Sequence, residues 1–242
     1  MSTDSYAGYE SWKKWSAVSF GACDASTAAY FAAEVKHSGI GKLNDLRVVE
    51  IGFGNGAFAH WCGISGANYS GTEVITELVG RGLQSGYDMH LATAGFDALG
   101  NAGSADLVCS WDVFEHIEIE KLRVLMAEVR TLLRPGGVLI ARFPSGDSPF
   151  ARAIQYGDLS HRNILGSSAV SQLANDLNFK VVQIREPRFV YFGVPLISLL
   201  RRVAVECVRR IVFSAMTVLL MGGGTPVLTP NMVVVLKKNE AD

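Results

Sequence analysis

The stretch from Val48 to Phe58 constrains the fold more than any other part of this 242-residue chain. It reads Val-Val-Glu-Ile-Gly-Phe-Gly-Asn-Gly-Ala-Phe, an apolar run that ends in three alternating glycines. A short apolar run bounded by glycines predicts a buried strand, and the helix-favouring residues 57–64 follow it. Because glycine has no Cβ, such a loop lets a cofactor lie against bare backbone. The stretch therefore predicts a strand, a loop and a helix that together bind a nucleotide-like cofactor.

Strand and helix signals alternate along the rest of the chain. Further strands are predicted at 68–72, 88–93, 106–110 and 138–143, and helices at 24–36, 74–83 and 118–133. After Pro144 the sequence predicts a helix at 167–177 and strands at 180–184 and 232–236. This alternation predicts an α/β fold whose mostly parallel sheet carries helices on both faces.

The composition fits one large domain and argues against several classes of protein. Hydrophobic residues make up 49% of the chain, which is ample for a buried core. A formal net charge of −1 argues against a nucleic-acid surface. The four cysteines are scattered and form no CxxC pair, so we expect reduced thiols, with neither disulfides nor a zinc site. The first residues contain no secretory signal, and we expect a cytoplasmic protein.

The glycine loop alone leaves two cofactor classes open. Gly52, Gly54 and Ala57 fit a dinucleotide fingerprint, and Glu73 lies 23 positions past Glu50, close to the spacing of a ribose-binding carboxylate. Nicotinamide and adenosyl cofactors both use loops of this kind. A carboxylate just before the glycines is poorly placed beside a pyrophosphate and well placed beside an amino group. Glu50 therefore favours an adenosyl cofactor with an amino-acid tail.

Four motifs in order resemble those of class I S-adenosylmethionine-dependent methyltransferases. They are Glu50–Gly56, Glu73 at a strand end, the stretch Asp106–Ile117 that contains Glu-His, and the turn Leu133–Gly137. The resemblance covers roughly residues 47–143 and is looser beyond them. It implies a Rossmann-like fold with a seven-stranded, mostly parallel sheet flanked by helices and a helical insertion before the last strand.

The resemblance also implies roles for individual residues. The methionine part of S-adenosylmethionine would contact the loop, and its amino group would lie near Glu50. Glu73 would bind both ribose hydroxyls, since a carboxylate offers two acceptor oxygens. The other expected cofactor residues are Gly52, Gly54, Asn55 and Gly56 in the loop, Phe96 and Asp97 at the adenine, and Ser110 and Trp111 at the methionine end or the acceptor pocket.

Methyl transfer to a hydroxyl needs a group that takes the acceptor's proton, and histidine suits this near neutral pH. His116 and His161 are the candidate catalytic residues, with Asp158 placed to orient His161 and Tyr156 as a further acceptor-binding candidate. The alternatives are that His116 caps the following helix and that His161 belongs to a surface loop. His60 and His90 are expected to be structural, and His37 to be exposed. Asp147, Asp158 and His161 offer no dense ligand spacing, so no metal site is expected.

Two segments outside the motifs allow more than one interpretation. Residues 1–17 carry Tyr6, Tyr9, Trp12 and Trp15, which fit either a helix packed on the core or a flap over a ligand. Residues 195–221 are apolar but are interrupted by four arginines, which argues against a membrane span. They predict an amphipathic helix that covers the sheet, forms a homodimer interface or lies on an anionic membrane surface.

These observations predict one methyltransferase domain over residues 1–242. Residues 1–44 form its N-terminal helical segment, 45–145 its cofactor-binding core, and 146–242 its acceptor side, with a helical insertion at 189–224. The resemblance suggests O-methylation of a sugar or glycan in bacterial polysaccharide or lipopolysaccharide synthesis, at the inner face of the membrane. The alternatives are O- or N-methylation of a quinone or other small metabolite, or an inactive scaffold that binds the cofactor.

Overall fold

The computed structural model describes residues 13, 15, 18–190, 196–221 and 223–240. It contains a seven-stranded sheet in the order β3-β2-β1-β4-β5-β7-β6. Neighbours from β3 to β5 are parallel, and β7 runs antiparallel to both β5 and β6. The strands are β1 (Arg47–Ile51), β2 (Asn68–Glu73), β3 (Met89–Leu91), β4 (Ala105–Trp111), β5 (Leu133–Pro144), β6 (Phe179–Arg185) and β7 (Asn231–Lys238). The predicted Rossmann-like fold is confirmed.

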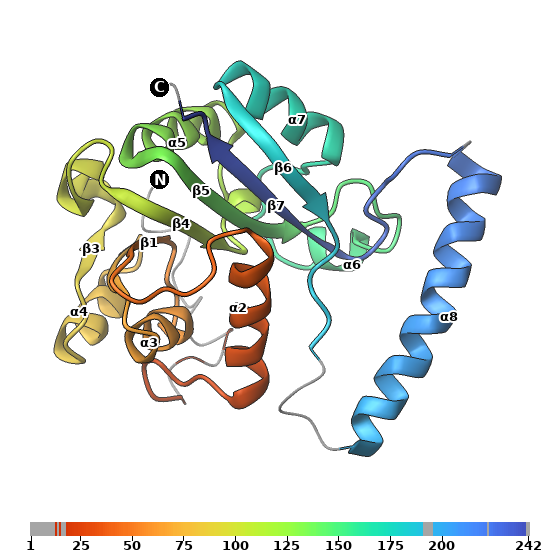
Figure 1. The fold of residues 1–242 in the computed structure, drawn as a ribbon, viewed down its shortest axis with the longest axis horizontal. Coiled ribbons are helices and arrows are strands. Elements are labelled where there is room, and N and C mark those ends of the chain that lie inside the picture. Colours follow the sequence, from red (N-terminus) through yellow and green to blue (C-terminus); the bar gives the residue numbers. More distant parts are fainter. Residues whose placement is uncertain (1–12, 14, 16–17, 191–195, 222, 241–242) are drawn as a thin grey trace.

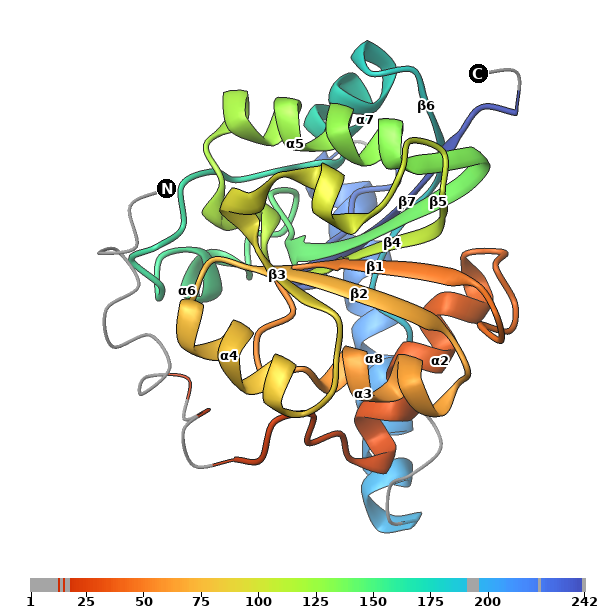
Figure 2. The same ribbon diagram turned by 90° about the vertical axis from the view of Figure 1, so that its left-hand side faces the viewer.

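Helices cover both faces of the sheet (Figures 1 and 2). On one face lie α2 (Ala25–His37), α3 (Ala57–Ile64) and α4 (Thr76–Gln84), and on the other lie α5 (Ile119–Leu132) and α7 (Ser167–Asp176). The short helix α6 (Arg152–Gln155) and the 3-10 turns η3 (Ala92–Ala94), η4 (Phe96–Leu99) and η5 (Phe114–His116) follow strand ends. The order of strands and helices brings the carboxyl ends of β1, β2 and β4 to one edge, where ligands of such sheets bind.

The strand β5 begins at Leu133, earlier than the predicted Val138. Leu133 already pairs with Ala105 of β4, and after a register shift Val138 pairs with Leu107. The predicted turn at Arg134–Gly137 is therefore an irregularity inside one long strand. A sequence pattern predicts where a helix ends more reliably than it predicts an irregular pairing between two strands.

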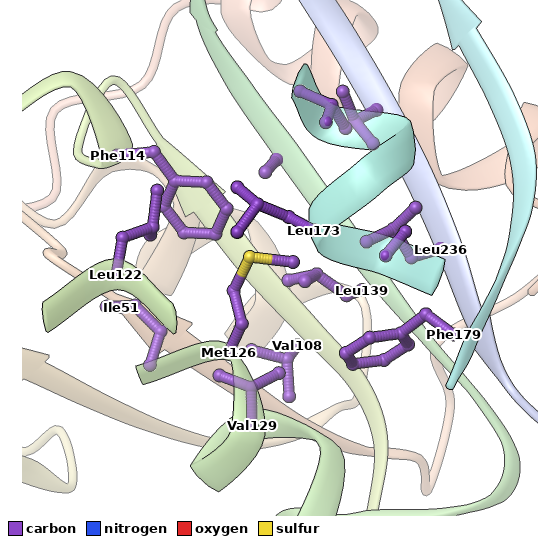
Figure 3. Close-up of a cluster of buried hydrophobic side chains, with 14 of the residues drawn as sticks. Ile51, Val108, Phe114, Leu122, Met126, Val129, Leu139, Leu173, Phe179 and Leu236 are labelled. Carbon is purple, nitrogen blue, oxygen red and sulfur yellow. The ribbon is translucent and has the colours of Figure 1, made fainter. Parts of the chain in front are cut away.

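The hydrophobic core between the sheet and α5 includes the apolar stripe of that helix (Figure 3). Leu122, Met126 and Val129 are almost completely buried and pack with Val108 and Leu139 from the central strands. These residues recur at three and four positions, so they share one helix face. Burying each such side chain stabilises the fold by about 1.5–3 kcal/mol.

A second cluster on the opposite face is rich in aromatic rings. Phe31 of α2 lies 5.0 Å from Phe58 of α3 and 5.4 Å from Trp111 at the end of β4, measured between ring centroids. The buried thiols of Cys62 and Cys109 belong to this cluster, and all four cysteines are free, as predicted. The cluster fixes α2 and α3 against the strands that carry the glycine loop.

The helix α8 (Leu196–Met221) lies beside the sheet and its two layers of helices, and it covers neither face of the sheet (Figure 1). Its 26 residues span about 39 Å at 1.5 Å per residue. The expectation that this segment covers the sheet is wrong, because large apolar side chains such as Ile197, Val208 and Ile211 are more than 60% exposed. Among the described residues, none of the helices is both long enough and apolar enough to cross a membrane.

The N-terminal aromatic residues are only partly described. Tyr6, Tyr9 and Trp12 lie outside the described residues. Trp15 is half-buried and packs with Phe20 against the small cluster under α4.

Candidate functional site

The glycine loop follows β1 and adopts a backbone that favours glycine. Gly52, Gly54 and Gly56 have φ values of 72°, 53° and 76°, a region that L-residues rarely adopt. The N–H groups of Gly52 and Phe53 donate to the carbonyl of Thr72 over 2.8 and 3.1 Å. The loop is therefore held on the end of β2, as a fixed cradle for a ligand requires.

The space above the three glycines is filled by the protein's own side chains. A Cβ on Gly52 would overlap Val113, a Cβ on Gly56 would overlap the ring of Phe20, and one on Gly54 would lie 3.0 Å from Trp15. The expectation that missing Cβ atoms leave room for the cofactor is therefore wrong for Gly52 and Gly56. Their small size serves the protein's packing, and the N–H groups of Gly52, Phe53, Gly54 and Gly56 all donate to acceptors within the protein.

Glu73 lies at the carboxyl end of β2, as predicted, and is buried. Its Oε2 accepts the N–H of Gly54 at 3.0 Å, and its Oε1 accepts the N–H groups of Val74 and Ile75 at 2.7 and 3.3 Å. A carboxylate has about four acceptor positions, so these bonds occupy much of its capacity. Ribose hydroxyls would have to share this carboxylate with the loop.

Glu50 is buried beneath the glycine loop, with Tyr69 donating its hydroxyl hydrogen to Oε2 over 2.6 Å. Burial raises the pKa of Glu50 to about 8, the Tyr69 hydrogen bond lowers it, and the charge of Glu73 raises it. A cation placed beside this carboxyl would favour its ionised form. Such an environment suits the amino group expected there.

The ends of α3 and β4 leave polar groups without protein partners. The N-cap of α3 is Gly56, which has no side chain to bond the first N–H groups of the helix. Ser110, paired in register with Ile51, is buried, and its Oγ has no hydrogen-bond partner among the described residues. The indole N–H of Trp111 also has no hydrogen-bond partner among the described residues. A polar cofactor with a carboxylate and an amino group fits these unfilled positions.

The remaining cofactor candidates divide into two groups. Phe96 packs on the core and Asp97 is exposed at the start of η4, next to the end of β3, so the adenine assignment stays a prediction. The side chain of Asn55 faces elsewhere: its Nδ2 donates to the Ser19 carbonyl at 3.2 Å, and its Oδ1 accepts from Arg81 at 3.3 Å. Asn55 therefore fastens the segment at Ser19 to the loop.

Arg81 of α4 is a site residue that the sequence did not reveal. Its guanidinium donates to the carbonyls of Trp15 and Val18 over 3.4 and 3.0 Å, in addition to Asn55. These bonds hold the N-terminal segment across the glycine loop. Trp15 packs on the core and lies against Gly54, whereas a flap over a ligand stays a prediction.

A second pocket of about 280 Å³ opens next to η5, and its lining is mainly polar. Its walls come from the end of β4, from η5, from residues 153–161 and from the start of β7. The lining residues are Lys13, Asp112, Glu115, His116, Pro144, Ala153, Ile154, Gly157, Asp158, His161 and Asn231. The two predicted catalytic histidines thus share one pocket with Asp158.

The rings of His116 and His161 lie 4.7 Å apart at an angle of 70°. The Nδ1 of His161 is 2.9 Å from the carbonyl of Gln155, so this nitrogen carries the hydrogen and donates it. The Nε2 of His161 faces Asp158 Oδ2 at 3.9 Å. The alternative that His161 is a surface-loop residue is wrong, because its side chain is only 10% exposed.

Asp158 is linked to His116 through Ser160. The Ser160 hydroxyl donates to Asp158 Oδ1 and lies 2.9 Å from His116 Nδ1. Burial would raise the pKa of Asp158, but the hydrogen bonds from Ser160 outweigh it and the pKa is lowered. Burial and, to a smaller extent, the neighbouring His161 lower the pKa of His116 to about 4. His116 is neutral at pH 7, and it does not cap α5, whose N-cap is Glu118.

Glu115 is a further residue of this pocket that the sequence did not single out. It is 4% exposed, and its Oε2 has no hydrogen-bond partner among the described residues. Burial, with the nearby charge of Asp112, raises the pKa of Glu115 well above its usual range. Asp112 itself is held by Arg142, whose Nε donates to Oδ1 at 2.9 Å. The Glu-His pair in the motif was the available signal, but only the histidine was assigned a role.

Several candidates lie outside both sites. Tyr156 is 66% exposed, interacts with Arg152 and does not line the pocket. Asp147 accepts the N–H groups of Ser167 and Val227, so it ties loops together. The three other histidines bond locally, as predicted: His60 to Tyr87, His90 to Asp88, and the exposed His37 to Ala33.

Comparisons with known proteins agree with this geometry. A family model described as a methyltransferase domain matches residues 22–184, and no curated protein sequence matches the chain. The fold is similar to an S-adenosylmethionine-dependent methyltransferase from Archaeoglobus fulgidus, with a TM-score of 0.60, 15% identity and coverage of 87% of this chain and 94% of the other.

Two further structures contain ligands. Magnesium protoporphyrin IX methyltransferase from Synechocystis with bound S-adenosylmethionine has a TM-score of 0.57 and 13% identity, covering 98% of this chain and 94% of the other. An N1-methyltransferase of 1,6-didemethyltoxoflavin from Burkholderia thailandensis, with S-adenosylhomocysteine bound, has a TM-score of 0.58 and 12% identity, covering 98% and 86%.

Proposed function

The chain belongs to the methyltransferase-domain family and uses S-adenosylmethionine as its cofactor, and we propose that it methylates a hydroxyl oxygen of a sugar or glycan. Residues 45–145 would hold the cofactor, and residues 146–242 would supply most of the acceptor side. The observation that carries the proposal is the polar pocket that gathers His116, Asp158 and His161 beside the end of β4.

The character of this pocket supports a hydroxyl-rich acceptor. Carboxylates, imidazoles, an ammonium group and the Asn231 amide provide hydrogen-bond donors and acceptors on several sides. A quinone ring would instead be expected to sit against apolar and aromatic side chains. O- or N-methylation of another small polar metabolite remains the second candidate. An inactive scaffold would have no use for two histidines and a carboxylate converging in a pocket.

The chain's residues would position the acceptor and handle its proton. The cofactor supplies an electrophilic methyl group, so the protein's task is alignment and proton removal. His161 presents Nε2 to the pocket because its Nδ1 donates to Gln155. Asp158 lies close enough to stabilise a positive charge on that ring. His116, neutral at pH 7, is suited to hydrogen-bonding the acceptor.

Turnover by variants tests this proposal. His161→Ala should lower the methylation rate by about 10²–10⁴-fold, the usual contribution of a proton-transfer group, while S-adenosylmethionine binding stays unchanged. His90→Ala, a histidine outside the pocket, is the matched control and should keep full turnover. Glycans from strains with and without the protein, analysed by mass spectrometry, should differ by methyl ethers. Methylation confined to nitrogen or to quinones would contradict the sugar assignment.

One polar side of the helix α8 contacts the rest of the protein. Glu206 is buried and pairs with Arg209 at 2.5 Å and with Arg210 at 2.9 Å. Glu186, just after β6, pairs with Arg209 at 3.0 Å, and the ring of Phe213 stacks on Phe150 at 5.9 Å. These contacts orient the helix so that its opposite side faces outward.

The outward side of α8 is apolar along most of its length and is interrupted by one arginine. At 100° per residue, Ile197, Ala204, Val208, Ile211, Ala215 and Leu219 fall within one third of the helix circumference, and all are exposed. Arg201, at the same angle as Leu219, lies within this third of the circumference, and Arg202 lies outside it; both are exposed. A helix that combines an exposed apolar side with exposed arginines is typical of helices that lie in a membrane interface.

We propose that this outward side of α8 binds an anionic membrane surface, which would place the enzyme at the inner membrane face beside lipid-linked glycans. The full chain should co-sediment with phosphatidylglycerol vesicles and much less with phosphatidylcholine vesicles. A variant with Ile197→Gln, Val208→Gln and Ile211→Gln should lose this binding, whereas Ile64→Gln, an exposed apolar residue on α3, should not. Loss of a dimer in the triple variant, with no vesicle binding by the native chain, would favour a homodimer interface instead.

A further inference from the structure

Three potential metal ligands converge in the acceptor pocket. Glu115 and His116 come from η5, and His161 comes from the loop after α6. A carboxylate oxygen and one ring nitrogen from each histidine lie within 4.8 Å of one another. This set could not be expected from the sequence, because 45 positions separate His116 from His161.

The pocket also contains buried carboxylate oxygens that lack donors. Glu115 Oε2 and Asp158 Oδ2 have no hydrogen-bond partner among the described residues. Burying a carboxylate without a partner is costly, and proteins compensate with a donor or a cation. Lys13 approaches Asp158 Oδ2 only to 3.9 Å. The side of the pocket at Glu115 therefore has the character of a cation site.

The hydrogen bonds around the two histidines match those of metal ligands. A metal-binding histidine usually donates from its second ring nitrogen to a carbonyl, carboxylate or similar acceptor, which fixes the ring. Here the Nδ1 atoms of His161 and His116 lie 2.9 Å from the Gln155 carbonyl and from the Ser160 hydroxyl. Both rings are thereby oriented with Nε2 as the ligating atom. Asp112 is not a competing ligand, since both of its oxygens accept from Arg142.

We propose that Glu115, His116 and His161 bind one divalent cation of the Mn²⁺ or Zn²⁺ type, and that the acceptor hydroxyl completes its coordination. Two imidazoles and one carboxylate favour such ions over Mg²⁺ and Ca²⁺, which prefer oxygen ligands. Bonds of about 2.1 Å place ligand atoms roughly 3–4 Å apart, so the three side chains would close by about 1 Å on binding.

The catalytic role of the cation rests on the proposed O-methylation. A bound divalent cation makes a coordinated hydroxyl more acidic, so the histidines would act as ligands and not as the base. The O–H bond of the acceptor breaks and its proton passes to solvent. The oxygen forms a bond to the methyl carbon, and the pair of electrons from the broken S–C bond stays on sulfur as S-adenosylhomocysteine leaves.

Calorimetric titration of the EDTA-treated full chain tests the site. Mn²⁺ is the main probe because the exposed Cys207 can bind Zn²⁺ elsewhere. We expect one saturable Mn²⁺ site per chain, weakened more than tenfold in Glu115→Gln and in His161→Gln and unchanged in His90→Gln. Retained S-adenosylmethionine binding verifies that each variant is folded. No saturable Mn²⁺ or Zn²⁺ binding by the native chain, or equal binding by both folded site variants, would overturn the proposal.

A turnover assay separates this inference from the proposed function. If chelation abolishes methyl transfer to a glycan and Mn²⁺ restores it, the cation site and the proposed O-methylation are both supported. If methyl transfer to a glycan persists after chelation, the catalytic role of the cation is refuted and the O-methyltransferase assignment survives with His161 as the base. If the cation binds but the methyl group goes to a quinone or a nitrogen, the sugar assignment fails and the site stands.

Discussion

At the scale of single residues, the carboxyl groups of Glu50 and Glu73 beneath the glycine loop say most about the candidate cofactor site. Glu73 holds the loop through the Gly54 N–H, so the same group that is expected to bind ribose also shapes the cradle. Glu50 is buried with a hydrogen bond from Tyr69, and its pKa of about 8 leaves it largely protonated at neutral pH. A buried acid of this kind makes stability depend on pH.

Replacing Glu50 with glutamine should remove part of that dependence. The folded state binds the Glu50 proton more tightly than the unfolded state, because the pKa of Glu50 in the folded state lies above its ordinary value of 4.5. The resulting stabilisation is present below pH 4.5 and is lost as the pH rises through about 8. The advantage of Glu50→Gln over the native chain should therefore grow by a few kcal/mol between pH 5 and 8, at about 1.4 kcal/mol per pKa unit. Urea unfolding without cofactor measures it, and a difference independent of pH would refute the prediction.

At the scale of elements, α2 is joined to the far end of the sheet by one buried carboxylate. Glu34 is fully buried, and it accepts from Arg185 of β6 at 2.6 Å and from the backbone N–H of Arg188 at 2.6 Å. A pattern of alanines and aromatics predicted α2, but it did not identify its partner strand. The ion pair connects segments about 150 positions apart.

Removing Glu34 should be costly because it leaves a guanidinium with no counter-charge in a mostly buried position. We expect Glu34→Ala to lower the free energy of unfolding by about 3–5 kcal/mol. The exposed pair between Arg123 and Asp176 is the matched comparison, since its N–O distance is also 2.6 Å. Asp176→Ala should cost less than about 1 kcal/mol. Chemical denaturation compares the two, and similar losses would show that burial does not control the strength of this pair.

At the scale of the whole molecule, the cofactor site and the acceptor pocket meet at the carboxyl end of β4. Ser110 and Trp111 end that strand, and Asp112 and η5 follow directly into the pocket. Trp15 and Lys13 connect the two sites from the N-terminal side, because Trp15 lies on Gly54 and Lys13 lines the pocket. Cofactor binding should therefore stabilise the described fold as a unit.

A thermal shift measures that linkage. S-adenosylmethionine at 100 times its Kd should stabilise the folded state by about 2.7 kcal/mol. For a chain of this size that corresponds to a rise in Tm of about 5–10 °C. Glu73→Ala should abolish most of the shift, whereas Glu77→Ala, an exposed acid on α4, should preserve it. A shift produced by NADH, or one that survives Glu73→Ala, would contradict the cofactor site described for this loop.

Much of the architecture could be predicted because its signals are local. Apolar periodicity identified α5, and a glycine run after an apolar strand identified the loop. The irregular start of β5 and the free-standing position of α8 were not predictable, because both depend on which distant segments pack together. The same holds for Asn55 and Arg81, whose side chains are committed to the N-terminal segment.

The sequence by itself determined the order of strands and helices, indicated the cofactor class through the family resemblance, and singled out the two histidines that share one pocket. Turn chemistry and side-chain period are properties of a few neighbouring residues, so they can be recognised without coordinates. Only the tertiary structure decided that Glu115 joins His116 and His161 in one pocket, and that the apolar side of α8 faces outward. Those facts depend on the path of the chain between η5 and Ser160 and on the ion pairs that orient α8, and neither is encoded in a local pattern.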